Sequence, residues 1–185
     1  MYHAKLGLSI SALCTIMLIL SSCSSMSPDG GSYGSYASNT VSSDYSSRLP
    51  ATVPAGQKMV MVDPRVHAWG AYDSDGKLVK AGLATAGSDW CPDLGRPCHT
   101  ASGHFRVMSL GGADCKSKIF PIPKGGAPMP YCMFFHGGQA LHGVSEGEVV
   151  EGNISHGCVR LHVADAEWLR FNFVNVGTKV EVKPY

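Results

Sequence analysis

Hydrophobic positions in the second part of the chain come in short runs that turn residues separate, and this pattern is typical of strands. Asp63 and Pro64 separate the first two runs, and the sequence Asp-Ser-Asp-Gly at 73–76 forms a turn into the third. We therefore expect the domain to open as a β-meander. The predicted strands cover residues 58–62, 66–72, 77–85, 103–108 and 178–182, and further apolar runs lie at 133–135 and 139–142.

Residues 164–173 have instead the apolar spacing of a helix. Asp165 and Glu167 lie in its first turn, where negative charge offsets the helix dipole, and Gly177 follows its end. Glycines recur between 137 and 157 and exclude a long helix there. The pattern predicts a mostly-β domain with one short helix near its C-terminal end.

The first 22 residues have the layout of a secretory signal peptide, with Lys5, a short hydrophobic core and then small residues. The apolar part is too short for a comfortable membrane span. The small residues that lead into Cys23 resemble the lipobox of bacterial lipoproteins, which implies that Cys23 becomes the lipidated first residue of the mature chain. Ser24 is consistent with sorting to the outer membrane. Ordinary signal cleavage elsewhere and an uncleaved anchor are the alternatives.

Residues 24–55 are rich in Ser, Gly and Tyr and show no hydrophobic periodicity, which predicts a flexible linker. The chain thus divides into a signal peptide (1–22), a lipidated cysteine with its linker (23–55) and a folded domain (56–185). The length of 185 residues and the 44% hydrophobic composition suit one modest domain with appendages. A net charge of +1, a pI near 7.6 and the lack of a basic run argue against a nucleic-acid partner.

Residue types that carry chemistry gather between positions 142 and 160, where one cysteine, two histidines and one arginine occur among glycines. A thiol is an effective nucleophile only as thiolate, which needs a nearby base or positive charge, and His142 or His156 can supply either to Cys158. Gly157 would let a substrate carbonyl come close to backbone N–H donors. This mixture predicts an active site with a cysteine nucleophile.

The sequence Leu141-His142-Gly143, followed by Ser155-His156-Gly157-Cys158-Val159-Arg160-Leu161, resembles the active-site motif of the L,D-transpeptidase (YkuD-like) family. The resemblance covers residues 57–185, because 101–107 and 176–180 also resemble family segments. It implies a β-sandwich with one short helix after the catalytic loop. It also implies an enzyme that acts on peptidoglycan stem peptides and needs no cofactor.

The resemblance implies a role for each matching position. Cys158 would be the nucleophile, and His142 would accept its proton while the backbone carbonyl of Gly143 orients the imidazole. His156 would flank the nucleophile as a further catalytic residue. Backbone N–H groups at Gly157 and Cys158 would form the oxyanion hole.

Substrate contacts are expected from Arg160, Ser155 and Tyr131. The guanidinium of Arg160 suits bidentate recognition of a carboxylate, such as that of a diaminopimelate side chain. The chain departs from the family pattern at Ala101, where proline is usual, and at Gly143, where some members have serine. Neither change removes a reactive side chain.

The chain has seven cysteines, and the five beyond Cys14 and Cys23 are an odd number for an exported protein. The family as a whole does not require four of them. Pairing Cys91 with Cys98 and Cys115 with Cys132 is one of the three connectivities that these four allow. If it holds, Cys158 is the unpaired thiol, as a catalytic role demands.

Zinc is a competing interpretation, because Cys158 and several histidines are ligand types. No CxxC pair or HExxH helix accompanies them, so we expect no metal. The histidines concerned are His136, His142, His156 and His162.

We therefore expect a periplasm-facing lipoprotein L,D-transpeptidase that its lipid anchor holds in the outer membrane, the location with which Ser24 is consistent. Its cysteine would form a thioester with a stem tetrapeptide, release D-Ala and transfer the acyl group to an amine. The acceptor stays open between a second stem (a 3-3 crosslink), a protein amine such as that of an outer-membrane protein, and water, which would make the protein an L,D-carboxypeptidase or hydrolase. A non-catalytic wall-binding lipoprotein is the alternative from another class.

Overall fold

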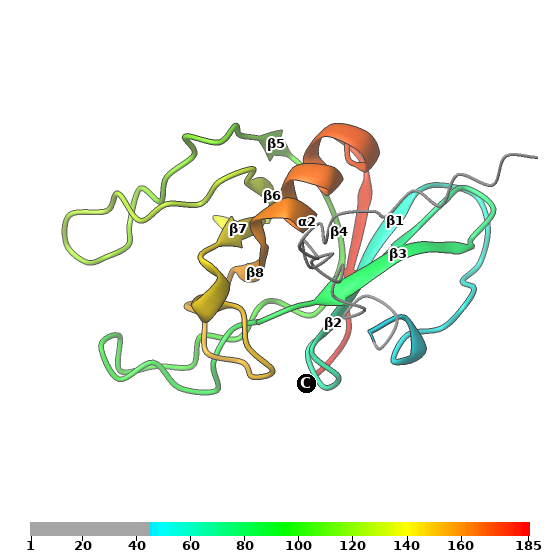
Figure 1. The fold of residues 1–185 in the computed structure, drawn as a ribbon. Helices are drawn as coiled ribbons and strands as arrows, with labels where there is room; N and C mark the ends of the chain where they lie inside the picture. Colours follow the sequence, from blue (N-terminus) through cyan, green and yellow to red (C-terminus); the bar gives the residue numbers. More distant parts are fainter. Residues whose placement is uncertain (1–44) are drawn as a thin grey trace, which may run out of the picture. The chain divides into compact units, whose positions relative to one another are not determined.

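The structure is a computed structural model that describes residues 45–185 (Figure 1). The predicted signal peptide, the lipidation at Cys23 and most of the predicted linker lie outside these residues. Within the described part of the chain, no helix combines the length and the apolar character that crossing a membrane requires.

Five strands form the first sheet in the order β3-β2-β1-β9-β4. The first three strands are the antiparallel meander that the sequence predicts, and β9 joins β1 in parallel. Gly76, at φ 78°, provides the left-handed backbone that the turn between β2 and β3 needs. The strands are β1 (Met59–Asp63), β2 (Ala68–Tyr72), β3 (Leu78–Leu83), β4 (Gly103–Arg106) and β9 (Lys179–Val182).

Four strands form the second sheet in the order β5-β6-β7-β8, and its last two strands run in parallel. Their bounds are β5 (Ser109–Leu110), β6 (Met133–His136), β7 (Gln139–Val144) and β8 (Val159–His162). A short 3-10 helix, η1 (Glu146–Glu148), lies in the connection from β7 to β8. The sequence pattern did not predict β5 and β8 as strands, because each is too short to show a periodicity of its own.

The predicted helix begins directly after β8, as Figure 1 shows. It consists of α2 (Val163–Trp168), which continues as a π-helical segment, η2 (Leu169–Phe173). The apolar residues Ala166, Leu169 and Phe173 of this segment are buried in the same core as both sheets. The helix thus fixes the strand that carries the candidate site against the rest of the domain.

The main hydrophobic core lies between the two sheets. Trp69 is fully buried in it, together with alternate residues of β1, β2 and β9 on one side and of β6, β7 and β8 on the other. This is the mostly-β, two-sheet architecture with one short helix that the sequence predicts. The strand residues concerned are Val60, Val62, Trp69, Ala71, Val180, Val182, Met133, Phe135, Leu141, Val159 and Leu161.

The linker predicted for residues 24–55 extends too far toward the C-terminus, because its residues from Tyr45 onward contact the folded domain. Tyr45 and Leu49, four positions apart around a helical turn, are buried with Met59, Met61 and Tyr72 on the other face of the first sheet. The chain then hydrogen-bonds to the β2–β3 turn, where the N–H of Val53 donates to Gly76 O (2.8 Å). The serines around these two residues give the stretch the composition of a linker, so the sequence did not predict their burial.

We predict that Leu161→Ala lowers the free energy of unfolding by about 2–5 kcal/mol, because it leaves a cavity in the core beneath the candidate site. Leu161 is 0% exposed, whereas Val79 on β3 is 48% exposed. The matched control Val79→Ala should cost less than about 1 kcal/mol. Urea unfolding followed by tryptophan fluorescence measures both, and equal losses would contradict this description of the core.

Candidate active site

The parallel pairing of β7 with β8 brings the predicted site residues together. Leu141 lies opposite Val159 and points into the core, so the next pair, His142 and Arg160, shares the other face of the sheet. Cys158 comes immediately before β8, beside the same strand. Residues from two segments of the motif therefore meet on one side of two neighbouring strands.

Cys158 is partly exposed and is the free cysteine of the described residues. It packs against a small apolar cluster that includes Met129, Cys132 and Ala140. Burial raises the pKa of its thiol, and a hydrogen bond with the backbone of Ala140 and the positive charge of Arg160 act in the opposite direction. At neutral pH these effects favour a protonated thiol that has stabilising groups ready for its thiolate.

His142 is 5% exposed, and its Nδ1 donates a hydrogen bond to the backbone carbonyl of Gly143 (2.9 Å). This is the contact that the family resemblance implies. Burial lowers the pKa of the imidazole to about 4, and the charge of Arg160 adds to this effect. His142 is therefore neutral at pH 7, and with the proton on Nδ1 its Nε2 is the nitrogen that can accept a proton.

Arg160 places a positive charge near both groups, since it lowers the pKa of His142 as well as that of Cys158. Its backbone is fixed on both sides, by β7 and by two hydrogen bonds with Thr85 (2.9 and 3.1 Å). Within residues 45–185 its guanidinium forms no ion pair. The charge is therefore available to an anionic ligand.

The turn before Cys158 is closed by its own serine. Ser155 is 1% exposed, its hydroxyl donates to Cys158 O (2.5 Å), and it accepts from the N–H of Gly157 (3.0 Å). Thr100 Oγ1 donates to Gly157 O (2.9 Å) from another loop. The hydroxyl of Ser155 is thus buried and used within the turn, and its predicted substrate contact stays a prediction.

Gly157 is required at this turn for two reasons. Its φ of 116° is one that residues with a side chain rarely adopt, and a Cβ there would lie 3.0 Å from Gln139 Nε2. Its N–H, predicted to be an oxyanion donor, bonds to Ser155 in this structure. That N–H has to exchange its partner before it can meet an oxyanion.

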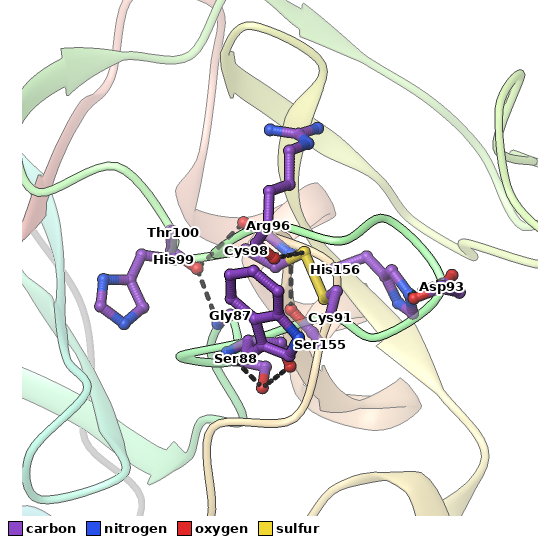
Figure 2. The surroundings of a disulfide bond; sticks show 12 residues. Gly87, Ser88, Cys91, Asp93, Arg96, Cys98, His99, Thr100, Ser155 and His156 are labelled. Carbon is purple, nitrogen blue, oxygen red and sulfur yellow. Dashed lines mark hydrogen bonds and ion pairs between the residues drawn. A yellow bond between two sulfur atoms is a disulfide. The ribbon is translucent and has the colours of Figure 1, made fainter.

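His156 contacts two loops that the motif does not include. Its Nε2 contacts both carboxylate oxygens of Asp93 (3.0 and 2.9 Å), and its ring contacts Phe120, with centroids 4.7 Å apart. Figure 2 shows the imidazole facing the carboxylate of Asp93. Neither partner could be predicted from the motif, because both lie in other loops and Asp93 is 63 positions away in the chain.

Tyr131 is directed toward the helix that follows β8. Its hydroxyl donates to Glu167 (2.8 Å), which raises its pKa, and its ring contacts Phe171 edge-on. Its φ of 60° is an uncommon backbone conformation for a tyrosine. The polar end of Tyr131 is therefore engaged by α2, and its predicted substrate contact stays a prediction.

The histidines considered as zinc ligands with Cys158 are spread over separate contacts. His136 packs on Phe105, and His162 lies 2.7 Å from Glu146. Among the described residues, the one group of three potential ligands is Cys91, Asp93 and His156, and the sulfur of Cys91 is held in a disulfide. Cys158 belongs to no such group in this part of the chain.

In the structure Cys91 is bonded to Cys98 and Cys115 to Cys132, with Cα atoms 5.9 and 6.2 Å apart. This is the connectivity singled out above among three. Both disulfides close loops that border the site, since Cys132 packs near Cys158 and the Cys91–Cys98 loop carries Asp93. Cys158 is left as the free thiol of the described residues.

The sequence model of the YkuD family, described as the L,D-transpeptidase catalytic domain, matches residues 57–182. The chain belongs to this family. No curated protein gives a significant match. The family match begins just before β1 and ends with β9, so it includes both sheets and every residue of the candidate site.

Solved L,D-transpeptidases share the fold. The structure from Xylanimonas cellulosilytica has 26% identity and a TM-score of 0.61, and the match covers 72% of this chain and 64% of that one. The enzyme from Mycobacterium smegmatis has 21% identity and a TM-score of 0.56, with 69% and 59% covered. L,D-transpeptidase 3 from Mycobacterium tuberculosis, solved with a faropenem-derived adduct, has 20% identity and a TM-score of 0.56, with 69% and 60% covered. The chain thus spans about three fifths of the length of these structures.

We predict that His142 makes the domain less stable in acid. Its pKa is lowered from 6.5 to about 4 in the folded state, so the unfolded chain binds the proton first as the pH falls below 6.5. The free energy of unfolding should therefore decrease by about 2–4 kcal/mol between pH 7 and about 4 through this group alone. His142→Gln should flatten that part of the pH dependence in urea unfolding, whatever its stability at pH 7.

His104→Gln is the matched control, because His104 on β4 has a side chain that is 79% exposed. It should keep the acid dependence of the unmodified protein. Equal pH dependence in the His142 variant and the unmodified protein would contradict the burial of a neutral imidazole at this site.

We also predict that the folded, unreduced protein has one fewer thiol accessible to Ellman's reagent after Cys158→Ser. Cys91→Ser/Cys98→Ser should leave the count unchanged, because both sulfurs are already bonded to each other. A lower count after the double substitution would mean that these two cysteines are free thiols.

Proposed function

We propose that the protein is a peptidoglycan L,D-transpeptidase in which Cys158 is the nucleophile and His142 its base. The observation that carries this proposal is the arrangement on β7 and β8. A free thiol adjoins the strand of a buried, neutral histidine, and the neighbouring arginine forms no ion pair with any of residues 45–185. An acyl transfer needs a nucleophile, a proton acceptor and a site for the oxyanion, and this arrangement offers each of them.

The two pKa shifts define the resting state of the proposed mechanism. Burial raises the pKa of Cys158 and lowers that of His142, so the thiol and the imidazole are both neutral before substrate binds. The proton passes from Sγ to Nε2 of His142 as the sulfur attacks the carbonyl at the L-centre of the third stem residue. The oxyanion then meets the backbone N–H groups of Gly157 and Cys158, once Gly157 has released Ser155.

Collapse of the tetrahedral intermediate breaks the bond to the terminal D-Ala. The leaving amine takes the proton from the imidazolium of His142, and the donor stays on Cys158 as a thioester. An acceptor amine next attacks the thioester carbonyl and gives its proton to His142, and the thiolate leaves and is reprotonated. The charge of Arg160 suits the carboxylate of a diaminopimelate side chain in either substrate.

The acceptor in this proposal is an amine, either of a second stem peptide or of a protein in the outer membrane. We propose in addition that the mature chain is a lipoprotein, anchored through Cys23 to the outer membrane and facing the periplasm. This part rests on the N-terminal sequence alone. Such an anchor would keep the domain close to the stem peptides that are its proposed substrates.

We predict that the protein, incubated with disaccharide-tetrapeptide, gains the mass of the donor without D-Ala and releases D-Ala. Cys158→Ala should fold but give neither product, because no group remains to form the thioester. Intact-protein mass spectrometry and D-Ala release measure the two steps. His104→Gln should behave like the unmodified protein, since His104 is exposed on β4.

The products identify the acceptor as well. Crosslinked dimers indicate a stem amine, and tripeptide alone indicates water, in which case the protein is an L,D-carboxypeptidase. Binding of the tetrapeptide without turnover by the unmodified protein indicates a wall-binding lipoprotein. Persistent acyl-enzyme or product in Cys158→Ala would overturn the mechanism.

A further inference from the structure

The contact between Asp93 and His156 links the motif to a loop that the family motif does not contain. The carboxylate lies 2.9 Å from His156 Nε2, and the two side chains face one another in Figure 2. His156 adjoins Gly157 in the chain and precedes the nucleophile by two positions. A contact that restricts His156 therefore also restricts the adjoining turn, whose N–H groups are the proposed oxyanion donors.

Several bonds close the loop that carries Asp93. A disulfide joins Cys91 to Cys98 across a separation of seven positions, and the N–H of Cys91 donates to Arg96 O (3.0 Å). The N–H groups of Leu94 and Gly95 both donate to Cys91 O (3.1 and 2.9 Å). Asp93 thus stands at the tip of a turn that is closed by covalent and hydrogen bonds.

The base of the same loop is bonded to the segment that leads into the nucleophile. The N–H of Ser155 donates to Ala86 O (3.0 Å), and the N–H of Ser88 donates to Ser155 O (2.8 Å). The N–H of Cys98 in turn donates to Ser88 O (3.0 Å). Figure 2 draws the hydrogen bonds among the labelled residues of this loop as dashed lines. The loop therefore contacts the 155–158 turn twice. Its backbone is hydrogen-bonded to Ser155, and the side chain of Asp93 contacts His156.

The ionised form of Asp93 is favoured at this place. The hydrogen bond with His156 lowers the pKa of the carboxyl group, so it is a carboxylate throughout the neutral range. An exposed pair of this kind contributes little to folding stability. Its geometry, with both carboxylate oxygens on one ring nitrogen, instead restricts where the imidazole can lie.

We propose that Asp93 is a positioning residue: the Cys91–Cys98 disulfide loop presents it to His156, and through His156 it holds the Gly157–Cys158 turn in one position, so that only the partner of the Gly157 N–H has to change when an oxyanion forms. The proposal rests on the proposed function only for its substrate. It makes the disulfide part of the site rather than a general stabiliser of the domain.

Two thiol reactions separate this role from others. Acylation of Cys158 by p-nitrophenyl acetate passes through an oxyanion, whereas alkylation by iodoacetamide is a displacement that forms none. Asp93→Asn keeps the size of the side chain and removes its charge. It should slow acylation about three- to tenfold and change alkylation less than about twofold. With disaccharide-tetrapeptide, kcat should fall by the same factor while KM changes less than about twofold.

Matched variants test whether the carboxylate of Asp93 and the disulfide that presents it are responsible for the change in rate. Asp93→Glu should recover most of the acylation rate, because it restores a carboxylate. Asp75→Asn removes an exposed carboxylate from the β2–β3 turn and should leave both rates unchanged. Cys91→Ser/Cys98→Ser should lose as much acylation as Asp93→Asn, and combining the two changes should cost no more than either alone. Cys158→Ala gives the blank for every rate.

The outcomes keep the two proposals apart. If Asp93→Asn slows acylation and spares alkylation, the positioning role holds even where the unmodified protein shows no turnover of tetrapeptide, a result that would defeat only the proposed function. Equal acylation rates in Asp93→Asn and Asp75→Asn would overturn the positioning role. So would parallel losses of acylation and alkylation, because they indicate a disturbed thiol rather than a displaced turn.

Discussion

The site depends first on the parallel pairing of β7 with β8. In a parallel pair the residues in register point to the same face, so the pairing that buries Leu141 and Val159 also places His142 beside Arg160. Parallel neighbours need a long connection, and here it contains the turn that carries Cys158. A shift of this register by one residue would expose the core residues and bury the charged one. Packing of the core therefore enforces the arrangement of the chemistry.

Much of this arrangement was predictable because local signals agree with the fold. The meander of β1 to β3, the helix after β8 and the last strand follow from apolar spacing and turn residues that are visible in the sequence. The motif around Cys158 and His142 predicted which residues meet. What escaped prediction has no local signal. Tyr45 and Leu49 pack on the sheet from within a serine-rich stretch, and their burial depends on partners that are distant in the chain.

The same reason explains which contacts inside the site the sequence did not predict. Ser155 has the type and the position of a substrate contact, but the turn uses its hydroxyl to satisfy its own backbone groups. A buried polar group without a partner is costly, so a serine enclosed by a tight turn is used by that turn first. Asp93 and Phe120, which contact His156, come from two different loops. Their sequence signal was limited to the cysteines that close those loops.

Burial, which enables the proposed chemistry, also opposes it in the resting state. The raised pKa of Cys158 and the lowered pKa of His142 both disfavour the thiolate–imidazolium pair. Transfer of the proton to His142 becomes favourable when a carbonyl is placed to accept the sulfur, because the negative charge then moves to an oxygen that backbone N–H donors can meet. A thiol with a raised pKa reacts more slowly with oxidants and alkylating agents than a thiolate does. Its reactivity is governed by the geometry of the turn around it, and this explains why a carboxylate on a neighbouring disulfide loop can matter for a reaction it never touches.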